Sequence, residues 1–183
     1  GPHLREGQVV VDFSTSHPSS TRKLAETLKS RGIDLVDAPL TGSKNEAATG
    51  TLNVICGGPE KTFESIKPAF NAIASNIFYV GPAGTGHTIK LINNYLGQFN
   101  LAAICEMLVF AQTYGVDLNK MFEVISVSGG NSTSFQSYMP KLITRDFTIN
   151  FLQKFVLKDI RYMIDLARET GVPTTLGDNL LAL

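Results

Sequence analysis

The sequence has no net charge, few cysteines and no unbroken hydrophobic run. Sixteen basic and sixteen acidic residues cancel, so the chain lacks the positive surface that nucleic acids and membrane surfaces attract. The longest apolar candidate, residues 91–111, is interrupted by asparagine, glutamine and glutamate and is too polar to span a membrane. We therefore expect a cytoplasmic globular protein without nucleic-acid or membrane partners.

Disulfide and metal chemistry is also poorly represented. Cys56 and Cys105 lie far apart within apolar segments, which favours two buried free thiols over a disulfide framework. The three histidines, His3, His17 and His87, have no metal-ligand spacing. We expect no metal site.

The N-terminal segment is unusual. Residues 1–3 (Gly-Pro-His) resemble the remnant of an affinity tag and are excluded from the fold. A β-branched run from Val9 to Phe13 follows almost at once and is typical of a buried strand. We expect the chain to begin inside a domain, so that a first βαβ unit, and any mitochondrial or plastid targeting segment, would lie upstream.

Strand and helix patterns alternate up to residue 85. Further strands are expected at Asp34–Leu40, 51–56 and 76–80, and helices at 19–32 and 59–75. Strands separated by helices indicate an α/β layer structure.

From His87 onward the pattern is helical. Residues 87–114 contain no proline or turn cluster and are apolar on nearly every side, which predicts a helix of about 40 Å buried within or between domains. More helices are expected at 118–127, 134–143 and 151–171. The predicted fold class is α/β followed by all-α.

The segment from Gly81 to Thr88 nearly matches the phosphate loop G-x-x-x-x-G-K-[ST]. His87 replaces the lysine of that motif, and a mostly neutral imidazole cannot supply the lysine's fixed charge. No later strand ending in aspartate is available to hold magnesium. We therefore do not predict a nucleotide triphosphatase.

Lys90 and Asn94 are four residues apart and project from one face of the long helix. Most lysines are solvated surface residues, but Lys90 is flanked by apolar residues on a helix with little polar surface. Burial would lower the pKa of its amine, and a lysine with a lowered pKa suits proton transfer.

Four segments, in order, resemble the β-hydroxyacid dehydrogenase family. They are VDFSTSHP (residues 11–18), DAPLTGSKNEAATGTLNVICGG (37–58), GTGHTIKLINN (84–94) and FVLKDIRYMIDLARETGVPTTL (155–176). The third is similar to the family's catalytic signature, in which G-x-x-x-K-x-x-N-N opens an interdomain helix. The family includes 3-hydroxyisobutyrate dehydrogenase and, more distantly, 6-phosphogluconate dehydrogenase.

This resemblance implies a Rossmann-like domain and a helical domain. Residues 4–85 would be the remainder of the NAD(P)-binding domain, and residues 86–183 a helical domain for substrate binding and oligomerisation. It implies NAD or NADP as cofactor, a small carboxylate-bearing substrate, and a homodimer or homotetramer.

The resemblance also assigns roles to residues. Lys90 would be the general acid/base, and Asn94 would hold the substrate oxygen. Thr41, Gly42 and Ser43 would bind the substrate carboxylate, as glycine-containing turns bind anions. Thr15 and Lys158 would contact the cofactor.

Two departures from the family pattern stand out. Thr41-Gly42-Ser43 replaces the usual Ser-Gly-Gly. This sequence is closer to that of the family's glyoxylate/succinic semialdehyde reductases than to that of 3-hydroxyisobutyrate dehydrogenase. The sequence also lacks the glycine-rich G-x-G-x-x-G that seats the pyrophosphate, so we expect this polypeptide to be an inactive fragment of an oxidoreductase. The alternative is a non-catalytic oligomerisation scaffold of the same fold, but the presence of both Lys90 and Asn94 favours the enzyme.

Overall fold

A computed structural model describes residues 3–148 and 152–182. Within these residues the strands are β1 (Val9–Asp12), β2 (Asp34–Asp37), β3 (Leu40–Thr41), β4 (Leu52–Gly57) and β5 (Ala74–Gly81). The helices are α1 (Pro18–Lys29), α2 (Lys44–Thr49), α3 (Glu60–Phe70), α4 (Thr85–Thr113), α5 (Leu118–Ser126), α6 (Thr133–Ile143), α7 (Gln153–Thr170) and α8 (Thr175–Ala182).

The strands form one mixed sheet. Strand β1 is parallel to β2 and β4 is parallel to β5, whereas β2 and β3 both run antiparallel to β4. The predicted strand over Asp34–Leu40 is split at Pro39, which has no N–H to donate. Its carbonyl still accepts a hydrogen bond from the backbone N–H of Ile55 at 3.1 Å, so the segment stays in one continuous register with β4.

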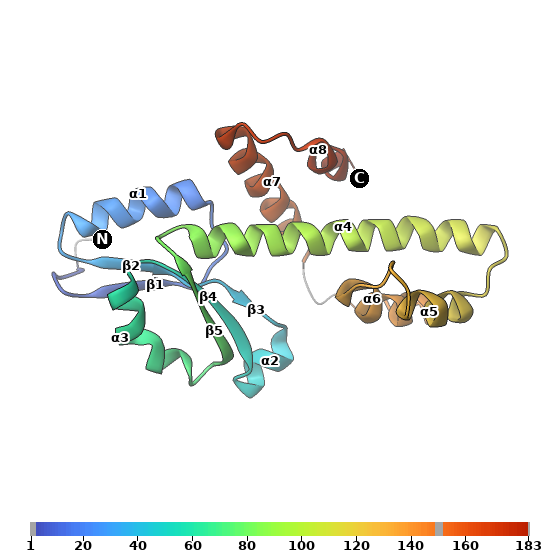
Figure 1. Ribbon diagram of the computed structural model, residues 1–183, viewed down its shortest axis with the longest axis horizontal. Coiled ribbons are helices and arrows are strands. Elements are labelled where there is room, and N and C mark those ends of the chain that lie inside the picture. The colour runs from blue at the N-terminus through green and yellow to red at the C-terminus, as the bar shows by residue number, and fades with distance from the viewer. Residues whose placement is uncertain (1–2, 149–151, 183) are drawn as a thin grey trace.

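Helices cover both faces of the sheet (Figure 1). Successive side chains of a strand point to opposite faces, and Leu35 and Val36 illustrate this on β2. Leu35 packs with Leu28 of α1, while Val36 packs with Phe63 of α3. The first turns of α4 lie against the sheet, and its remainder extends away to meet α5, α6 and α7 (Figure 1).

One helix boundary and two further helices differ from the prediction. The helix expected over residues 59–75 ends at Phe70, because Ala74 already pairs with Leu52 in the sheet. The short helix α2 and the C-terminal helix α8 were not predicted. For α2 the sequence carried a signal, since Ser43 and Glu46 form an S-x-x-E capping box.

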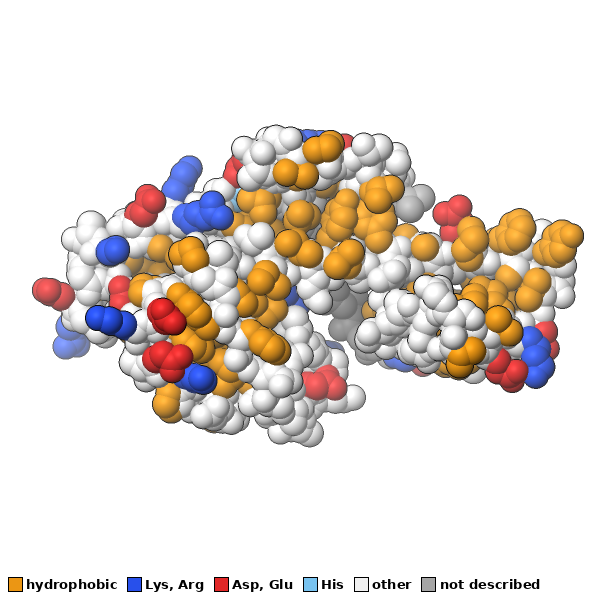
Figure 2. Space-filling view, in the orientation of Figure 1, with side chains coloured by type: hydrophobic (Ala, Val, Ile, Leu, Met, Phe, Trp, Pro, Cys, Tyr) orange, Lys and Arg blue, Asp and Glu red, His pale blue; other side chains and the backbone are white. Residues whose placement is uncertain are grey.

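Helix α4 is less buried than its apolar sequence predicts. The side chains of Leu96 and Phe110 are 58% and 63% exposed, because this chain packs α6 and α7 against only part of the helix. Cys105, on the same helix, is exposed, so the prediction of two buried thiols holds only for Cys56. Along α4, apolar side chains gather on the visible surface (Figure 2).

None of the helices within residues 3–148 and 152–182 combines the length and apolar character that a transmembrane span requires. In the same residues no three histidine, cysteine or acidic side chains cluster as a metal site would.

Candidate active site

A buried carboxylate anchors the start of α4. Gly84, in the left-handed conformation, provides no capping side chain for the helix. Instead Asp37, which is fully buried at the end of β2, accepts hydrogen bonds from the N–H of Gly84 at 2.7 Å and of His87 at 2.8 Å. These N–H groups lie in the loop that resembles a phosphate loop, and an internal anion already satisfies them.

Two glycines let α4 approach the sheet this closely. A Cβ on Gly86 would lie 2.5 Å from the carbonyl oxygen of Ile55, and one on Gly57 would lie 2.8 Å from the N atom of Gly86. Both distances are well inside van der Waals contact with backbone atoms, which cannot move aside easily. The glycines of this segment therefore serve helix–sheet packing.

We expect Gly86→Ala to lower the free energy of unfolding by about 2–3 kcal/mol, because the added methyl group overpacks the helix–sheet contact. Chemical denaturation measures this change. Gly97→Ala is the matched control: nothing lies within 4 Å of its added Cβ, and alanine there should stabilise α4 by about 0.5–1 kcal/mol. Equal stability of the two variants would contradict the close packing at Gly86.

Lys90 lies one turn after this anchor and is half-buried. Burial lowers the pKa of its amine, the negative charge of Asp159 raises it, and the positive charge of Lys158 lowers it. Among the described residues no hydrogen bond or ion pair holds the Lys90 ammonium group. Its amine is thus desolvated and free to meet a bound molecule.

Asp159 of α7 connects the predicted residues, although the sequence analysis did not select it. Its side chain is only 3% exposed. Its Oδ2 accepts a hydrogen bond from Asn94 Nδ2 at 2.6 Å, and its Oδ1 lies 2.9 Å from Lys158 Nζ. The available signal was the position of Asp159 directly after Lys158, within a segment that resembles the family's late helix.

Lys158 reaches across to the other domain. Its ammonium group donates a hydrogen bond to the carbonyl oxygen of Thr15 and lies 4.9 Å from the centroid of the Tyr162 ring. Thr15 follows the carboxyl end of β1. The structure therefore brings Thr15, Lys90, Asn94 and Lys158 together through Asp159.

No hydrogen bond or ion pair within the described residues joins Thr41, Gly42 or Ser43 to this cluster. Gly42 has φ +122°, a conformation that favours glycine. Ser43 donates both its backbone N–H, at 2.6 Å, and its hydroxyl, at 2.5 Å, to Glu46, and these bonds lower the pKa of Glu46. Ser43 thus already binds a carboxylate, but an internal one.

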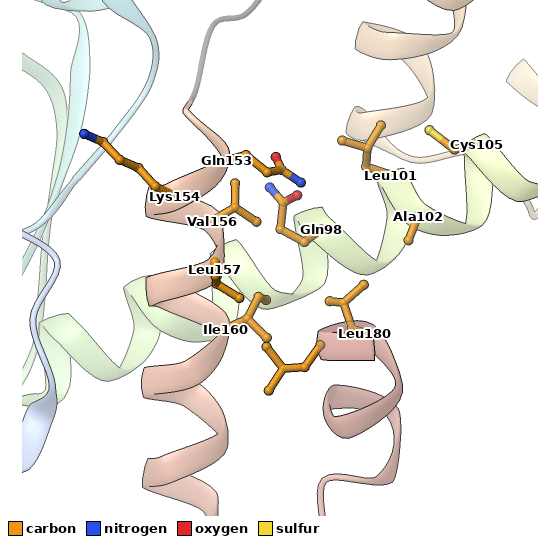
Figure 3. A pocket seen from close by; sticks show the side chains of 11 residues that line it. Gln98, Leu101, Ala102, Cys105, Gln153, Lys154, Val156, Leu157, Ile160 and Leu180 are labelled. Carbon is orange, nitrogen blue, oxygen red and sulfur yellow. The ribbon is translucent and has the colours of Figure 1, made fainter. Parts of the chain in front are cut away.

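A cavity of about 540 Å³ lies elsewhere, between α4, α7 and α8 (Figure 3). Its lining is mostly apolar and includes Leu101, Leu157 and Leu180. It contains none of the predicted site residues, so it is a feature of the helical half rather than of the Lys90 cluster.

The cluster's position suits a dinucleotide. In open α/β sheets ligands bind beyond the carboxyl ends of the strands, and Thr15 lies there beside Lys158. A carbonyl, two lysine side chains and an amide provide hydrogen-bonding groups for a polar ligand.

Comparisons with known proteins identify the family and the fold. The family profile described as the NAD-binding domain of NADP-dependent 3-hydroxyisobutyrate dehydrogenase matches residues 84–183. The profile of the NAD-binding domain of 6-phosphogluconate dehydrogenase matches residues 1–81. Both describe NAD-binding domains, so the prediction of NAD or NADP as cofactor is confirmed.

Individual relatives are similar over nearly the whole chain. The 2-(hydroxymethyl)glutarate dehydrogenase of Eubacterium barkeri is 36% identical over 170 residues, which are 92% of this chain and 56% of that protein. The NAD-dependent L-serine dehydrogenase of Pseudomonas aeruginosa is 29% identical, over 99% of this chain and 63% of its own length. The chain thus spans less than two thirds of these relatives.

Solved structures confirm the fold class, a Rossmann-like domain followed by a helical domain. The 3-hydroxyisobutyrate dehydrogenase of Mycobacterium tuberculosis, solved with L-serine, superposes with a TM-score of 0.91 at 27% identity, covering 98% of this chain and 64% of that one. The 3-hydroxyisobutyrate dehydrogenase of Salmonella typhimurium gives a TM-score of 0.84 at 28% identity, covering 98% and 63%. The chain therefore belongs to the β-hydroxyacid dehydrogenase family, of the 3-hydroxyisobutyrate dehydrogenase type.

Proposed function

We propose that the complete protein transfers a hydride between NAD(P) and a small 3-hydroxy acid or the corresponding semialdehyde, with Lys90 as general acid/base. The observation that carries this proposal is a half-buried amine with a lowered pKa, four residues from an amide that is fixed by a buried carboxylate. The dinucleotide, when bound, accepts or supplies the hydride. Lys90 takes the hydroxyl proton during oxidation and returns it during reduction.

Asn94 orients the substrate oxygen in this proposal. A carboxylate only accepts hydrogen bonds, so the bond to Asp159 fixes which end of the Asn94 amide carries the hydrogens. The second hydrogen of Nδ2 is then available to the substrate oxygen. Fixed orientation matters because hydride transfer is sensitive to small displacements of the reacting atoms.

Thr15 and Lys158 would face the cofactor, and Thr41, Gly42 and Ser43 would bind the substrate carboxylate. To bind the substrate, Ser43 must exchange one carboxylate for another, since Glu46 now accepts the hydrogen bonds of its backbone N–H and its hydroxyl. A substrate carboxylate would take the place of Glu46, whose side chain would turn to solvent.

An assay of the complete enzyme with hydroxy acids tests the proposal. The panel contains 3-hydroxyisobutyrate, L-serine, L-threonate and 2-(hydroxymethyl)glutarate, the compounds in the names of relatives. We expect NAD(P)H absorbance to appear with at least one of them. An assembled, cofactor-saturated protein that turns over no 3-hydroxy acid and reduces no semialdehyde would favour the scaffold alternative.

We also propose that the protein is a homodimer or homotetramer, because exposed apolar side chains follow α4 from its middle to its end. They are Leu96, Met107 and Phe110 on α4 and Tyr114 directly after it, which recur on one face at helical spacing. Contiguous apolar patches on a surface mark interaction sites.

We expect sedimentation at micromolar concentration to show dimers or larger assemblies, and Phe110→Glu to shift the population towards monomer by placing a charge in the apolar contact. Lys120→Glu, an exposed change on α5, is the control for added negative charge. A strictly monomeric wild-type protein would contradict this proposal.

A further inference from the structure

His87 is fully buried and belongs to none of the roles described so far. Its backbone N–H is bonded to Asp37, and its ring joins two other segments. The Nε2 atom lies 3.1 Å from the carbonyl oxygen of Ser14, and the Nδ1 atom lies 2.7 Å from the hydroxyl oxygen of Thr21. One side chain of α4 thus holds both the segment after β1 and helix α1.

The partners determine the state of the ring. A carbonyl oxygen only accepts, so Nε2 carries a hydrogen and donates it to Ser14. Burial lowers the pKa of His87, against the raising effects of Asp37, Asp12 and the Ser14 bond, while Lys158 adds to the lowering. A lowered pKa favours the neutral ring, in which Nδ1 accepts the hydrogen bond of the Thr21 hydroxyl at 2.7 Å. The carbonyl oxygen of His17, at 3.3 Å, is the more distant acceptor for the same hydroxyl.

The contacts of His87 and those of Lys158 together form a closed circuit between α4, the segment after β1 and α7. His87 holds the carbonyl of Ser14 from α4, and Lys158 binds the next carbonyl, that of Thr15, from α7. Asp159 then returns from α7 to α4 through Asn94. This circuit of contacts leaves α4 at His87 and returns to it at Asn94, and Lys90 lies on α4 between these two residues.

We propose that His87 is a positioning residue for Lys90: its neutral ring fixes the Ser14–Thr15 carbonyls where Lys158 reaches them, and thereby keeps the Lys158 charge beside Lys90. The catalytic importance of His87 rests on the proposed function of Lys90. Its effect on the position of Lys158 does not depend on that function. Without the Ser14 anchor the Thr15 carbonyl would move, and Lys158 would lose the partner that holds it across the two domains.

The test is an NMR titration of the isotopically methylated Lys90 amine in this chain, in His87→Leu and in His87→Gln. Leucine cannot hold Ser14, so Lys158 loses its bond to Thr15 and keeps only its α7 partners, Asp159 and Tyr162. Its positive charge then acts less strongly on Lys90, and the Lys90 titration midpoint shifts upward. Glutamine offers a donor and an acceptor at nearly the spacing of the two ring nitrogens, so it should keep the wild-type midpoint. An unchanged midpoint in folded His87→Leu would overturn the proposal.

Further variants separate positioning from loss of stability. Phe63→Leu weakens the core on the α3 side of the sheet and should leave the Lys90 midpoint unchanged. Lys158→Met should reproduce the upward shift directly. If His87→Leu fails to fold, Thr21→Val removes only the hydroxyl that orients the ring; a smaller upward shift supports the proposal and no shift overturns it. The readout needs no turnover, so it stays valid even if Lys90 proves not to be the acid/base.

Discussion

Replacing Lys90 with alanine in the complete enzyme should lower kcat by about 10²–10⁴-fold, the usual contribution of a positioned acid/base. Alanine can neither take nor return the hydroxyl proton, and a water molecule would not be held in the position of the Lys90 amine. The dissociation constant for the dinucleotide should change little, because the role proposed for Lys90 is at the substrate hydroxyl. Steady-state kinetics and cofactor titration measure the two quantities separately.

The control for this substitution is Lys120→Ala. Lys120 is an exposed lysine of α5 that pairs with Glu123, so its loss should leave kcat unchanged. If Lys90→Ala keeps wild-type kcat, the acid/base assignment is wrong.

Asp159→Asn should have the second largest effect. The carboxylate is nearly fully buried and serves both Asn94 and Lys158, and hydrogen bonds to a charged group contribute about 1.5–3 kcal/mol. Loss of that amount in the transition state corresponds to a decrease in kcat of about 10- to 100-fold. Asparagine keeps the shape of the side chain, so the change reports on charge and orientation.

The pH dependence of Asp159→Asn has a definite direction. Asp159 raises the pKa of Lys90 and burial lowers it, so removing the negative charge lowers that pKa further. Oxidation needs the neutral amine, hence kcat/KM for oxidation rises as pH passes upward through this pKa. The rise should move to lower pH in the variant.

Asp165→Asn tests whether removal of any negative charge on α7 shifts the pH profile of oxidation. Asp165 is exposed and lies 3.6 Å from Arg168, so the oxidation profile should stay at its wild-type position. A shift of the Asp159→Asn profile to higher pH would contradict the charge balance assigned to Lys90.

The sequence predicted residues whose signals are local. Helical spacing placed Lys90 and Asn94 on one face of α4, and short motifs selected Thr15 and Lys158 from distant segments. The structure brings these four together, while their roles stay predictions.

Residues whose function depends on distant partners were missed. Asp37 lies in the middle of the strand predicted over residues 34–40, and only the fold shows that it caps a helix that begins nearly 50 residues later. His87 resembled a defect in a phosphate loop, because its partners Ser14 and Thr21 precede it by more than 60 residues. The exposure of Cys105 likewise depends on which helices pack against α4, and the spacing of apolar residues does not specify that.

The most direct test of the account compares two titrations of one protein: the Lys90 amine followed by NMR, and kcat/KM for oxidation followed against pH. The kinetic profile reports the essential group of the free enzyme. We predict that the two midpoints coincide and lie below 10.5, the ordinary pKa of a lysine. An amine that titrates at or above that value, or a kinetic midpoint that Lys90 does not share, would contradict the account.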